Sequence, residues 1–361
     1  MRIGLNLLYL LPGQVGGTET HAAGILEGLA ALSHQHEIIV FVNEEAREWP
    51  IPTDPRFHRV VCPIQARSRA RRYYYEQFRL APLARRHGVE ILHSLGYVGP
   101  LIAPMPTIVA VHDINFVVLG HLMPARRRWT LRLIVGAAVR RAAAVATGSE
   151  FSRRELVGLY PHLKCEVCVI PNAPRRRIRT AQRPPIDPPY FLAFSSTYPN
   201  KNLPRLLEAW VQARAMLPTG YRLVLVGHRP DRKDLLEAEA VDWLGYQDDA
   251  TVATLLRGAR ALIFPSYYEG FGLPVLEAQQ EGVPVAASNR SAVPEVTGDG
   301  GILFDPFSVS DMAHAIARLG NDDALCSRLA AAGRVNVSRY NWPASARILL
   351  SLYERVRSGE P

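Results

Sequence analysis

Short apolar runs alternate with longer amphipathic stretches along the whole chain. A run of apolar residues without polar alternation is typical of a strand that is buried on both faces of a parallel sheet. In the first half such runs lie at residues 3–10, 37–42, 59–64, 91–95, 107–111, 144–147 and 166–170. In the second half they lie at residues 191–195, 223–227, 261–264, 284–288 and 302–304. The pattern predicts two sets of buried parallel strands.

The longer amphipathic stretches, for example residues 18–32 and 126–141, are predicted as helices. Because strands that alternate with helices form βαβ units, the predicted fold class is α/β. Residues 171–189 are rich in proline and arginine, show no periodicity and form the predicted linker. We therefore expect two doubly wound domains, residues 1–180 and 181–343, facing each other across a deep cleft. The last helical stretch, within residues 344–361, is long enough to cross back onto the first domain.

Composition places the chain among soluble globular proteins, because 48% of its 361 residues are hydrophobic and 21% are charged. Its four cysteines are too few for a disulfide framework and favour a reducing compartment. Cys165 and Cys168 form one C-x-x-C pair without a second, which favours structural cysteines over a metal site. The apolar stretch from Leu131 to Ala146 is interrupted by arginines, so no transmembrane span is predicted. The expected location is the cytoplasm.

The formal net charge of +9 is unevenly distributed. Seven arginines lie between Arg67 and Arg86, interleaved with aromatic residues. Such a surface binds an anionic membrane, a phosphorylated lipid or nucleic acid, or it is a solvated helix face. These interpretations remain open for this cluster. The arginines of the linker, from Arg175 to Arg179, are interpreted as solvated.

The most informative segment runs from Pro265 to Glu277, between an apolar strand and a helix that ends near Gly282. Glu269 and Glu277 bracket a turn that contains Gly270 and Gly272. Glycines let the backbone approach a ligand and direct N–H groups toward it, and a helix start favours anionic oxygens. We place Glu277 in the first helical turn, where its carboxylate can accept two hydrogen bonds from a vicinal diol. The combination predicts a site for a phosphorylated sugar.

Polar residues follow other predicted strands as well. Gly16 and Gly17 precede the first helix and form a second phosphate-type loop, although the sequence is neither G-x-G-x-x-G nor a Walker loop. His112 follows the strand at residues 107–111, where ligands bind, and it is a functional candidate. Lys201 lies just after the strand at residues 191–195 and can place a positive charge on a diphosphate.

Several motifs are absent from the sequence, including D-x-D, H-E-x-x-H and G-x-S-x-G. A divalent-metal site of the D-x-D type is therefore not expected. A diphosphate would be neutralised by cationic side chains and backbone dipoles instead.

With these residues and motifs the chain resembles the family 4 retaining glycosyltransferases, which have two Rossmann-like domains in the GT-B fold. The match covers nearly the whole chain. The E-x7-E motif from Glu269 to Glu277 is the most specific element. The remaining motifs match in order and spacing: Gly16-Gly17-Thr18-Glu19, His112-Asp113, Ser149-Glu150-Phe151-Ser152, Pro171-Asn172-Ala173, Lys201-Asn202 and Leu244-Gly245-Tyr246.

The resemblance implies a role for each matching residue. Glu277 would bind the nucleotide ribose, and Glu269 would face the transferred sugar. Lys201 would neutralise the diphosphate, and His112 would approach the sugar from the first domain. The remaining donor-binding residues implied are Gly16, Gly17, Ser196, Gly245, Tyr246, Gly270, Phe271, Gly272 and Leu273. Ser196 occupies a position where many relatives carry an arginine.

The resemblance also implies a mechanism without a metal ion or a cofactor. The donor is a nucleotide sugar, and the acceptor hydroxyl attacks the face that the diphosphate leaves, so the anomeric configuration is retained. The pattern is most similar to bacterial mannosyltransferases of lipopolysaccharide synthesis, so GDP-mannose is the first donor hypothesis. UDP-glucose, UDP-N-acetylglucosamine and dTDP-rhamnose remain open.

The implied acceptor is a glycan or a polyprenyl-diphosphate-linked glycan. Arginines between Arg67 and Arg86 would then hold the enzyme at the anionic inner face of the plasma membrane. Three alternatives remain: a sugar-nucleotide 2-epimerase, a glycosyl phosphorylase, and a basic nucleic-acid-binding protein. The last leaves the glutamates and the glycine loops unexplained, so binding of nucleic acid is not expected.

Overall fold

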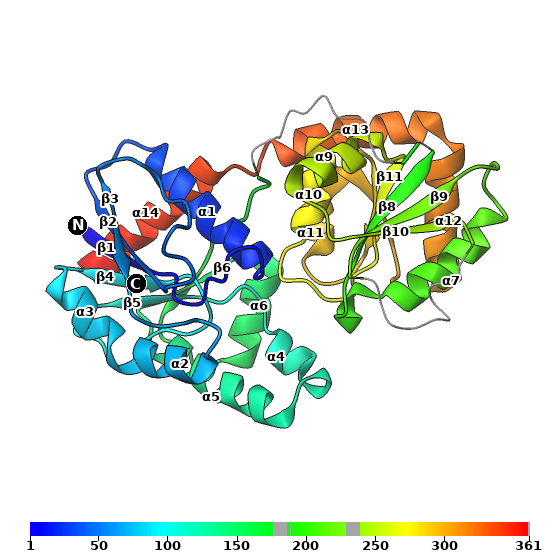
Figure 1. The fold of residues 1–361 in the computed structure, drawn as a ribbon. Helices are drawn as coiled ribbons and strands as arrows, with labels where there is room; N and C mark the ends of the chain where they lie inside the picture. The colour runs from blue at the N-terminus through cyan, green and yellow to red at the C-terminus, as the bar shows by residue number, and fades with distance from the viewer. Residues whose placement is uncertain (176–185, 188, 229–238, 360–361) are drawn as a thin grey trace. The chain divides into compact units, whose positions relative to one another are not determined.

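The computed structural model describes residues 1–175, 186–187, 189–228 and 239–359. The chain divides into two compact units (Figure 1). Unit 1 comprises Met1–Ala173 and Asn341–Pro361, and unit 2 comprises Pro174–Tyr340. The boundary that the sequence predicts at residue 180 lies outside the described residues, as do most of the linker arginines.

Unit 1 is built on a sheet of parallel strands in the order β3-β2-β1-β4-β5-β6-β7. The strands are β1 (Arg2–Asn6), β2 (Glu37–Val42), β3 (Phe57–Val61), β4 (Ile91–Ser94), β5 (Thr107–Ala110), β6 (Ala144–Thr147) and β7 (Glu166–Val169). The order reverses direction at β1 and β4, which makes the sheet doubly wound. Each apolar run predicted in this half of the chain overlaps one of these strands, although β1 and β3 begin before their runs, at Arg2 and Phe57.

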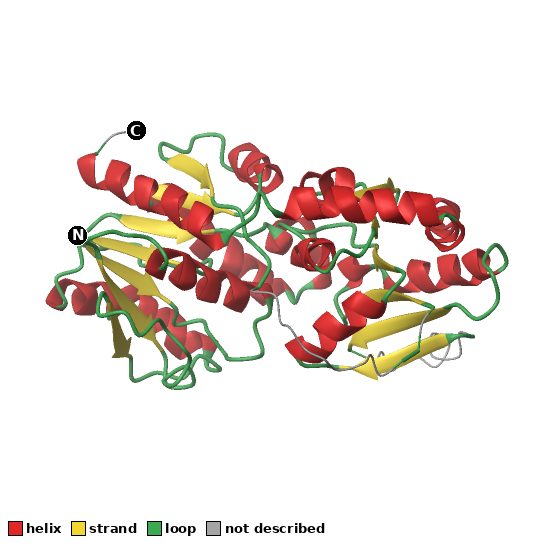
Figure 2. Cartoon of the chain, turned by 90° about the horizontal axis from the view of Figure 1, so that it is seen from above, coloured by secondary structure: helices red, strands yellow, loops and turns green. Residues whose placement is uncertain are grey.

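Helices cover both faces of this sheet (Figures 1 and 2). They are α1 (Gly17–Ala30), α2 (Arg69–Phe78), α3 (Leu80–Arg86), α4 (Asn115–Val118), η1 (Gly120–Leu122), α5 (Ala125–Arg141), α6 (Glu150–Leu159) and α14 (Trp342–Ser358). The C-terminal helix α14 packs against α1. The last helix of the chain is therefore part of unit 1, although the residues that precede it belong to unit 2.

The contact between α1 and α14 depends on two glycines of α1. A Cβ atom at Gly24 would lie 2.0 Å from the ring of Trp342, and one at Gly28 would lie 2.3 Å from the Trp342 carbonyl oxygen. Real Cβ atoms do not approach other heavy atoms so closely, so any side chain at these positions forces the helices apart. The two glycines thus let the returning helix pack against the first.

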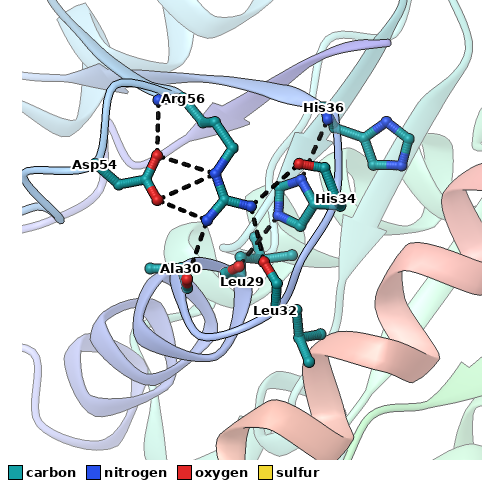
Figure 3. A network of polar contacts seen from close by, with 7 residues as sticks. All are labelled: Leu29, Ala30, Leu32, His34, His36, Asp54 and Arg56. Atoms are coloured by element: carbon teal, nitrogen blue, oxygen red, sulfur yellow. Dashed lines mark hydrogen bonds and ion pairs between the residues drawn. The ribbon is translucent and has the colours of Figure 1, made fainter.

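Arg56 closes the C-terminal end of α1 (Figure 3). Its guanidinium donates to the carbonyl oxygens of Ala30 at 3.0 Å and Leu32 at 2.8 Å, which lack partners within the helix. Asp54 binds the same guanidinium, and this hydrogen bonding lowers the pKa of the Asp54 carboxyl to about 2. His34 adds a contact from its Nε2 to the carbonyl oxygen of Leu29 at 3.1 Å.

Unit 2 contains a second parallel sheet in the order β10-β9-β8-β11-β12-β13. Its strands are β8 (Tyr190–Ser195), β9 (Arg222–Gly227), β10 (Val241–Gly245), β11 (Ala261–Phe264), β12 (Val285–Ser288) and β13 (Gly301–Phe304). The strand β10 was not predicted. It lies at the edge of the sheet, its residues are half-buried, and Asp242 interrupts its apolar run.

Two apolar clusters sandwich the second sheet. One contains residues of α7 (Leu203–Arg214), including the fully buried Trp210, and of α12 (Val309–Asn321). The other contains residues of α9 (Asp249–Gly258) and α10 (Leu273–Gln280). The remaining elements of the unit are η2 (Pro199–Lys201), α11 (Val293–Thr297), η3 (Gly298–Gly300) and α13 (Asp323–Val337). The prediction of two doubly wound α/β domains is confirmed.

Within the described residues, no helix is both long and apolar enough to cross a membrane. The four cysteines carry free thiols, and Cys168 is buried in β7. The arginine-rich stretch from Arg67 to Arg86 forms two helices, α2 and α3, which meet at Arg79.

We predict that Gly24→Ala lowers the free energy of unfolding by about 1–3 kcal/mol, because the new methyl group overlaps the Trp342 ring. Urea unfolding followed by circular dichroism measures the change. Gly158→Ala is the matched control, since Gly158 also lies in a helix and a Cβ there meets nothing within 4 Å. The control should be neutral or gain about 0.4–1 kcal/mol. Equal effects at the two positions would contradict the packing described for α1 and α14.

Candidate functional site

The turn between β11 and α10 carries the two glutamates of the most informative motif. Gly272 precedes the helix with φ 115°, in the left-handed region that glycine adopts without strain. The helix starts at Leu273 with Pro274 in its first turn, and Gly282 with φ 76° follows its end. Glu277 is thus the fifth helical residue. Its predicted place in the first turn is wrong, because the backbone stays irregular as far as Gly272.

Lys201 and Glu269 form an ion pair at the carboxyl edge of the second sheet. The Lys201 Nζ atom lies 2.6 Å from a carboxylate oxygen of Glu269 and 5.7 Å from the centre of the Phe264 ring. The two side chains are 27% and 16% exposed, so the pair remains accessible from outside. The carboxylate of Glu269 thus compensates the positive charge of the lysine in a partly buried place.

Hydrogen bonds of the neighbouring residues hold the segments that carry Lys201 and Glu269 in place. Asn200, in η2, donates from its side chain to the Tyr268 carbonyl oxygen at 2.9 Å, and it accepts from the Tyr267 N–H at 3.0 Å. The Glu269 N–H donates to the Ser291 hydroxyl at 3.0 Å. Ser291 has φ 58°, which is uncommon for a residue other than glycine. The sequence analysis did not find Ser291, because its role depends on a contact across 22 residues.

Glu277 is half-buried and has no hydrogen bond to its carboxylate from the described residues. Burial raises the pKa of this carboxyl, the nearby Arg175 guanidinium lowers it and the Asp249 carboxylate raises it. Arg175 is itself paired with Asp249. A partly desolvated carboxylate is costly without a partner, so Glu277 is suited to bind hydroxyl groups of a ligand.

The other candidates of unit 2 also follow strand ends. Ser196 comes directly after β8, and its hydroxyl accepts from the Tyr198 N–H at 3.3 Å. Gly245 ends β10 with φ 67°, and the next residue, Tyr246, is 82% exposed. Because the strands are parallel, these residues lie at the same edge of the sheet as Lys201 and Glu269.

In unit 1 the predicted glycine loop leads into α1. Gly16 is the residue before the helix and has φ 55°, and a Cβ there would meet nothing within 4 Å. The glycine is therefore required for its backbone conformation. Glu19 braces the loop, since its carboxylate accepts from the Gly13 N–H at 2.8 Å and from the indole of Trp49 at 3.0 Å. Gly17 is the first residue of the helix.

His112 follows β5 and is half-buried. Its Nε2 atom lies 3.0 Å from the carbonyl oxygen of Leu95, and burial lowers its pKa. Asp113 has a different task, because its carboxylate accepts from the Asn115 N–H at the start of α4.

Two buried histidines near His112 escaped the sequence analysis. The His21 ring lies 4.6 Å from the His112 ring, and His93 in β4 contacts the Tyr353 hydroxyl at 2.8 Å. Burial lowers the pKa of both histidines, to about 3 for His93. Each looks like an ordinary core residue in an amphipathic helix or a buried strand. The partners come from distant parts of the chain, so no local pattern reveals them.

A search of the described ranges finds no group of three or more His, Cys, Asp or Glu side chains that could hold a metal ion. The candidate site of unit 2 thus offers one lysine, two carboxylates and the backbone N–H groups at the start of α10.

Comparisons with protein families match nearly the whole chain. Residues 15–173 match the model described as Glycosyltransferase Family 4, and residues 174–336 match the model described as Glycosyl transferases group 1. The junction between the two matches coincides with the division of the chain after Ala173.

Individual proteins are similar at lower levels. The O-antigen chain mannosyltransferase B of Escherichia coli is 28% identical over 68% of this chain and 70% of its own length. Sucrose-phosphate synthase from Thermosynechococcus elongatus covers both chains fully, with a TM-score of 0.74 and 19% identity. Anabaena HepE, in a complex with UDP and glucose, covers 98% of this chain and 99% of its own, with a TM-score of 0.72 and 17% identity. At these identities the two structures establish the fold alone.

The buried histidines predict how stability depends on pH. His93 stays neutral in the fold, whereas in the unfolded chain it gains a proton below its ordinary pKa of 6.5. Acidification therefore favours unfolding, and stability falls as the pH drops from about 6.5 toward 3. We expect His93→Gln to remove about 1.4 kcal/mol of the stability loss between pH 7.5 and pH 5.5.

Urea unfolding at the two pH values measures this difference. The control is His162→Gln, because His162 is exposed in unit 1. The same pH dependence in wild type and His93→Gln would show that the His93 ring does not remain neutral in the fold.

Proposed function

From the premise that the chain belongs to the family 4 retaining glycosyltransferases, we propose that it moves mannose from GDP-mannose to a glycan or a polyprenyl-diphosphate-linked glycan. The family resemblance inferred from the motifs is confirmed, and sugar transfer is therefore preferred to epimerisation or phosphorolysis. The similarity to an O-antigen chain mannosyltransferase supports the choice of mannose. The observation that carries the site assignment is the Lys201–Glu269 pair beside the glycine-rich turn at the carboxyl edge of unit 2.

The donor is proposed to bind along this edge. Glu277 accepts hydrogen bonds from the ribose hydroxyls, and Glu269 faces the sugar. Backbone N–H groups of Gly270, Phe271, Gly272 and Leu273 surround the sugar and the phosphate nearest to it. The exposed Tyr246 and the neighbouring Gly245 contact the nucleobase.

The diphosphate is proposed to compete with Glu269 for Lys201. Without donor, the lysine is neutralised by the glutamate at 2.6 Å. With donor bound, Lys201 and the start of α10 stabilise the negative charge that develops as the diphosphate leaves. Ser196, which stands where many relatives carry an arginine, donates its hydroxyl to the same phosphates. No metal ion takes part in this proposal.

Within unit 1, the N–H groups of the Gly16–Gly17 loop are proposed to bind phosphate oxygens, and His112 is proposed to accept a hydrogen bond from a sugar hydroxyl. The acceptor hydroxyl attacks the face that the diphosphate leaves, and the leaving phosphate oxygen takes its proton. The new glycosidic bond then keeps the anomeric configuration of the donor.

The helix α2 is proposed to contact an anionic membrane that carries the acceptor. Tyr74 and Phe78 are 58% and 64% exposed, and their rings lie 5.1 Å apart. The arginines from Arg67 to Arg86 are exposed except Arg72, which turns inward to the buried Glu76. Exposed aromatic rings framed by arginines suit the interface of an anionic bilayer.

The donor site is tested with Glu277→Ala. A charge-assisted hydrogen bond contributes about 1.5–3 kcal/mol, so the affinity for the donor should fall at least about tenfold. A thermal-shift screen against nucleotide sugars first identifies the donor, because a bound ligand raises the melting temperature. Isothermal titration with that donor then measures the loss.

The matched control is Glu208→Ala, which removes an exposed carboxylate from α7 in the same unit. Its affinity should equal that of the wild type. An unchanged affinity in Glu277→Ala would reject the assignment of the ribose site. A screen in which no nucleotide sugar raises the melting temperature would reject the donor class.

The membrane contact is tested by flotation with liposomes that contain phosphatidylglycerol. Each arginine near the surface contributes about 1 kcal/mol, so Arg69→Gln/Arg71→Gln should lower partitioning by roughly thirtyfold. Arg328→Gln/Arg347→Gln removes the same charge from exposed positions on α13 and α14 and should leave flotation unchanged. Equal recovery with neutral liposomes would exclude the electrostatic contact.

A further inference from the structure

Three histidines gather within unit 1, two of them buried and the third, His112, half-buried. His21 comes from α1, His93 from β4, and His112 follows β5. His21 and His93 are 4% and 1% exposed. The proposed function uses His112 alone, and its two neighbours have no assigned task.

The contact of His112 with Leu95 determines which ring nitrogen carries the proton. A carbonyl oxygen accepts hydrogen bonds and cannot donate them, so Nε2 at 3.0 Å from Leu95 must carry the hydrogen. In the neutral ring Nδ1 then holds a lone pair. Within the described part of the chain, Nδ1 has no hydrogen-bond partner of its own.

His21 is held firmly against this ring. Its Nδ1 atom lies 2.7 Å from the side-chain oxygen of Asn172. The His21 ring meets the His112 ring at 4.6 Å with an angle of 72°, and it meets Trp342 at 6.2 Å with an angle of 70°. Rotation of the His21 ring would break the bond to Asn172 and disturb both edge contacts.

The backbone of His112 is fixed from another side. Ser152, in α6, donates its hydroxyl to the His112 carbonyl oxygen at 3.1 Å. Ser149 is the N-cap residue of the same helix, and its hydroxyl accepts from the Ser152 N–H at 3.1 Å. Contacts from separate segments therefore hold the two histidines in place: Asn172, beyond β7, binds the His21 ring, the His21 ring of α1 packs against the His112 ring, and Ser152 of α6 binds the His112 backbone.

Positive charge is disfavoured throughout this group. Burial lowers the pKa of His21, His93 and His112, and His112 lowers the pKa of the other two further. A proton on one ring would be repelled by a proton on another, so the group stays neutral near physiological pH.

We propose that His21, oriented by Asn172, is a positioning residue that keeps His112 in the neutral Nε2–H form with the Nδ1 lone pair available to a substrate hydroxyl. The part that concerns the substrate rests on the proposed function. The part that concerns the tautomer depends on the geometry of unit 1 alone. Loss of His21 or Asn172 would let the His112 ring rotate, admit water and populate the Nδ1–H form.

Nitrogen-15 NMR of the histidine rings tests the tautomer without any substrate. Long-range proton–nitrogen correlations distinguish the two neutral forms and the protonated ring, and the His112→Asn variant assigns the signals. In wild type we expect the Nε2–H form from pH 8 to pH 6. In His21→Ala and in Asn172→Ala we expect mixed tautomers at pH 8 and partial protonation at pH 6.

His34→Ala is the matched control, because His34 also contacts a backbone carbonyl oxygen, that of Leu29 at 3.1 Å. It should leave the His112 signals unchanged. Asn172→Ala decides the result if His21→Ala does not fold, since it retains the His21 ring. Unchanged His112 signals in the folded variant, or a proton on Nδ1 in wild type, would overturn the inference.

Kinetics then separate positioning from general damage. With the donor identified, Asn172→Ala should lower kcat by about tenfold to a hundredfold while the donor Kd stays within about twofold. As the pH is lowered, the kcat of Asn172→Ala should fall first. The kcat of wild type should fall only at a lower pH. If the protein transfers no sugar, the proposed function is rejected, but the NMR test of the His112 tautomer still holds. Altered NMR signals with unchanged kcat would overturn the positioning role.

Discussion

The parallel direction of the strands in each unit is the constraint on which the rest of the structure depends. Parallel strands end at one common edge, and the segments that follow them are free of the sheet's hydrogen bonding. In unit 2 this edge collects Ser196, Lys201, Gly245 and Glu269, which come from three separate segments that follow β8, β10 and β11. In unit 1 the corresponding edge carries His112. Buried apolar strands thus place polar side chains where a ligand can reach them, and apolar clusters pack on both faces of the second sheet.

Charge compensation explains why the edge of unit 2 is stable without a ligand. Lys201 and Glu269 neutralise each other at 2.6 Å, so neither is left as an isolated charge. Glu277 differs, because burial raises the pKa of its carboxyl and no described residue donates a hydrogen bond to it. A nucleotide sugar would relieve this cost, since its ribose hydroxyls are donors and its diphosphate attracts the lysine. Part of the binding free energy would therefore come from groups that the free protein leaves poorly satisfied.

Much of the fold could be predicted from the sequence, because a strand buried on both faces has to be apolar. Each predicted apolar run overlaps a strand, whereas the half-buried edge strand β10 was not predicted, since Asp242 breaks its run. The motif from Glu269 to Glu277 was recognised by local spacing. The helical turn in which Glu277 lies was predicted wrongly, because the start of α10 depends on the backbone angles at Gly272. The partners His21 and Asn172 are 151 residues apart, and such contacts leave no local pattern.

The central claim is that Glu277 binds the donor through its ribose. It is tested most directly by measuring the Kd of the best-bound nucleoside diphosphate and of its 2′-deoxy form, for wild type and for Glu277→Ala. In wild type, loss of the 2′-hydroxyl should weaken binding by about tenfold to a hundredfold. In Glu277→Ala the two nucleotides should bind with nearly equal affinity, because the partner of the hydroxyl is gone. The same preference for the ribose form in both proteins would contradict the account.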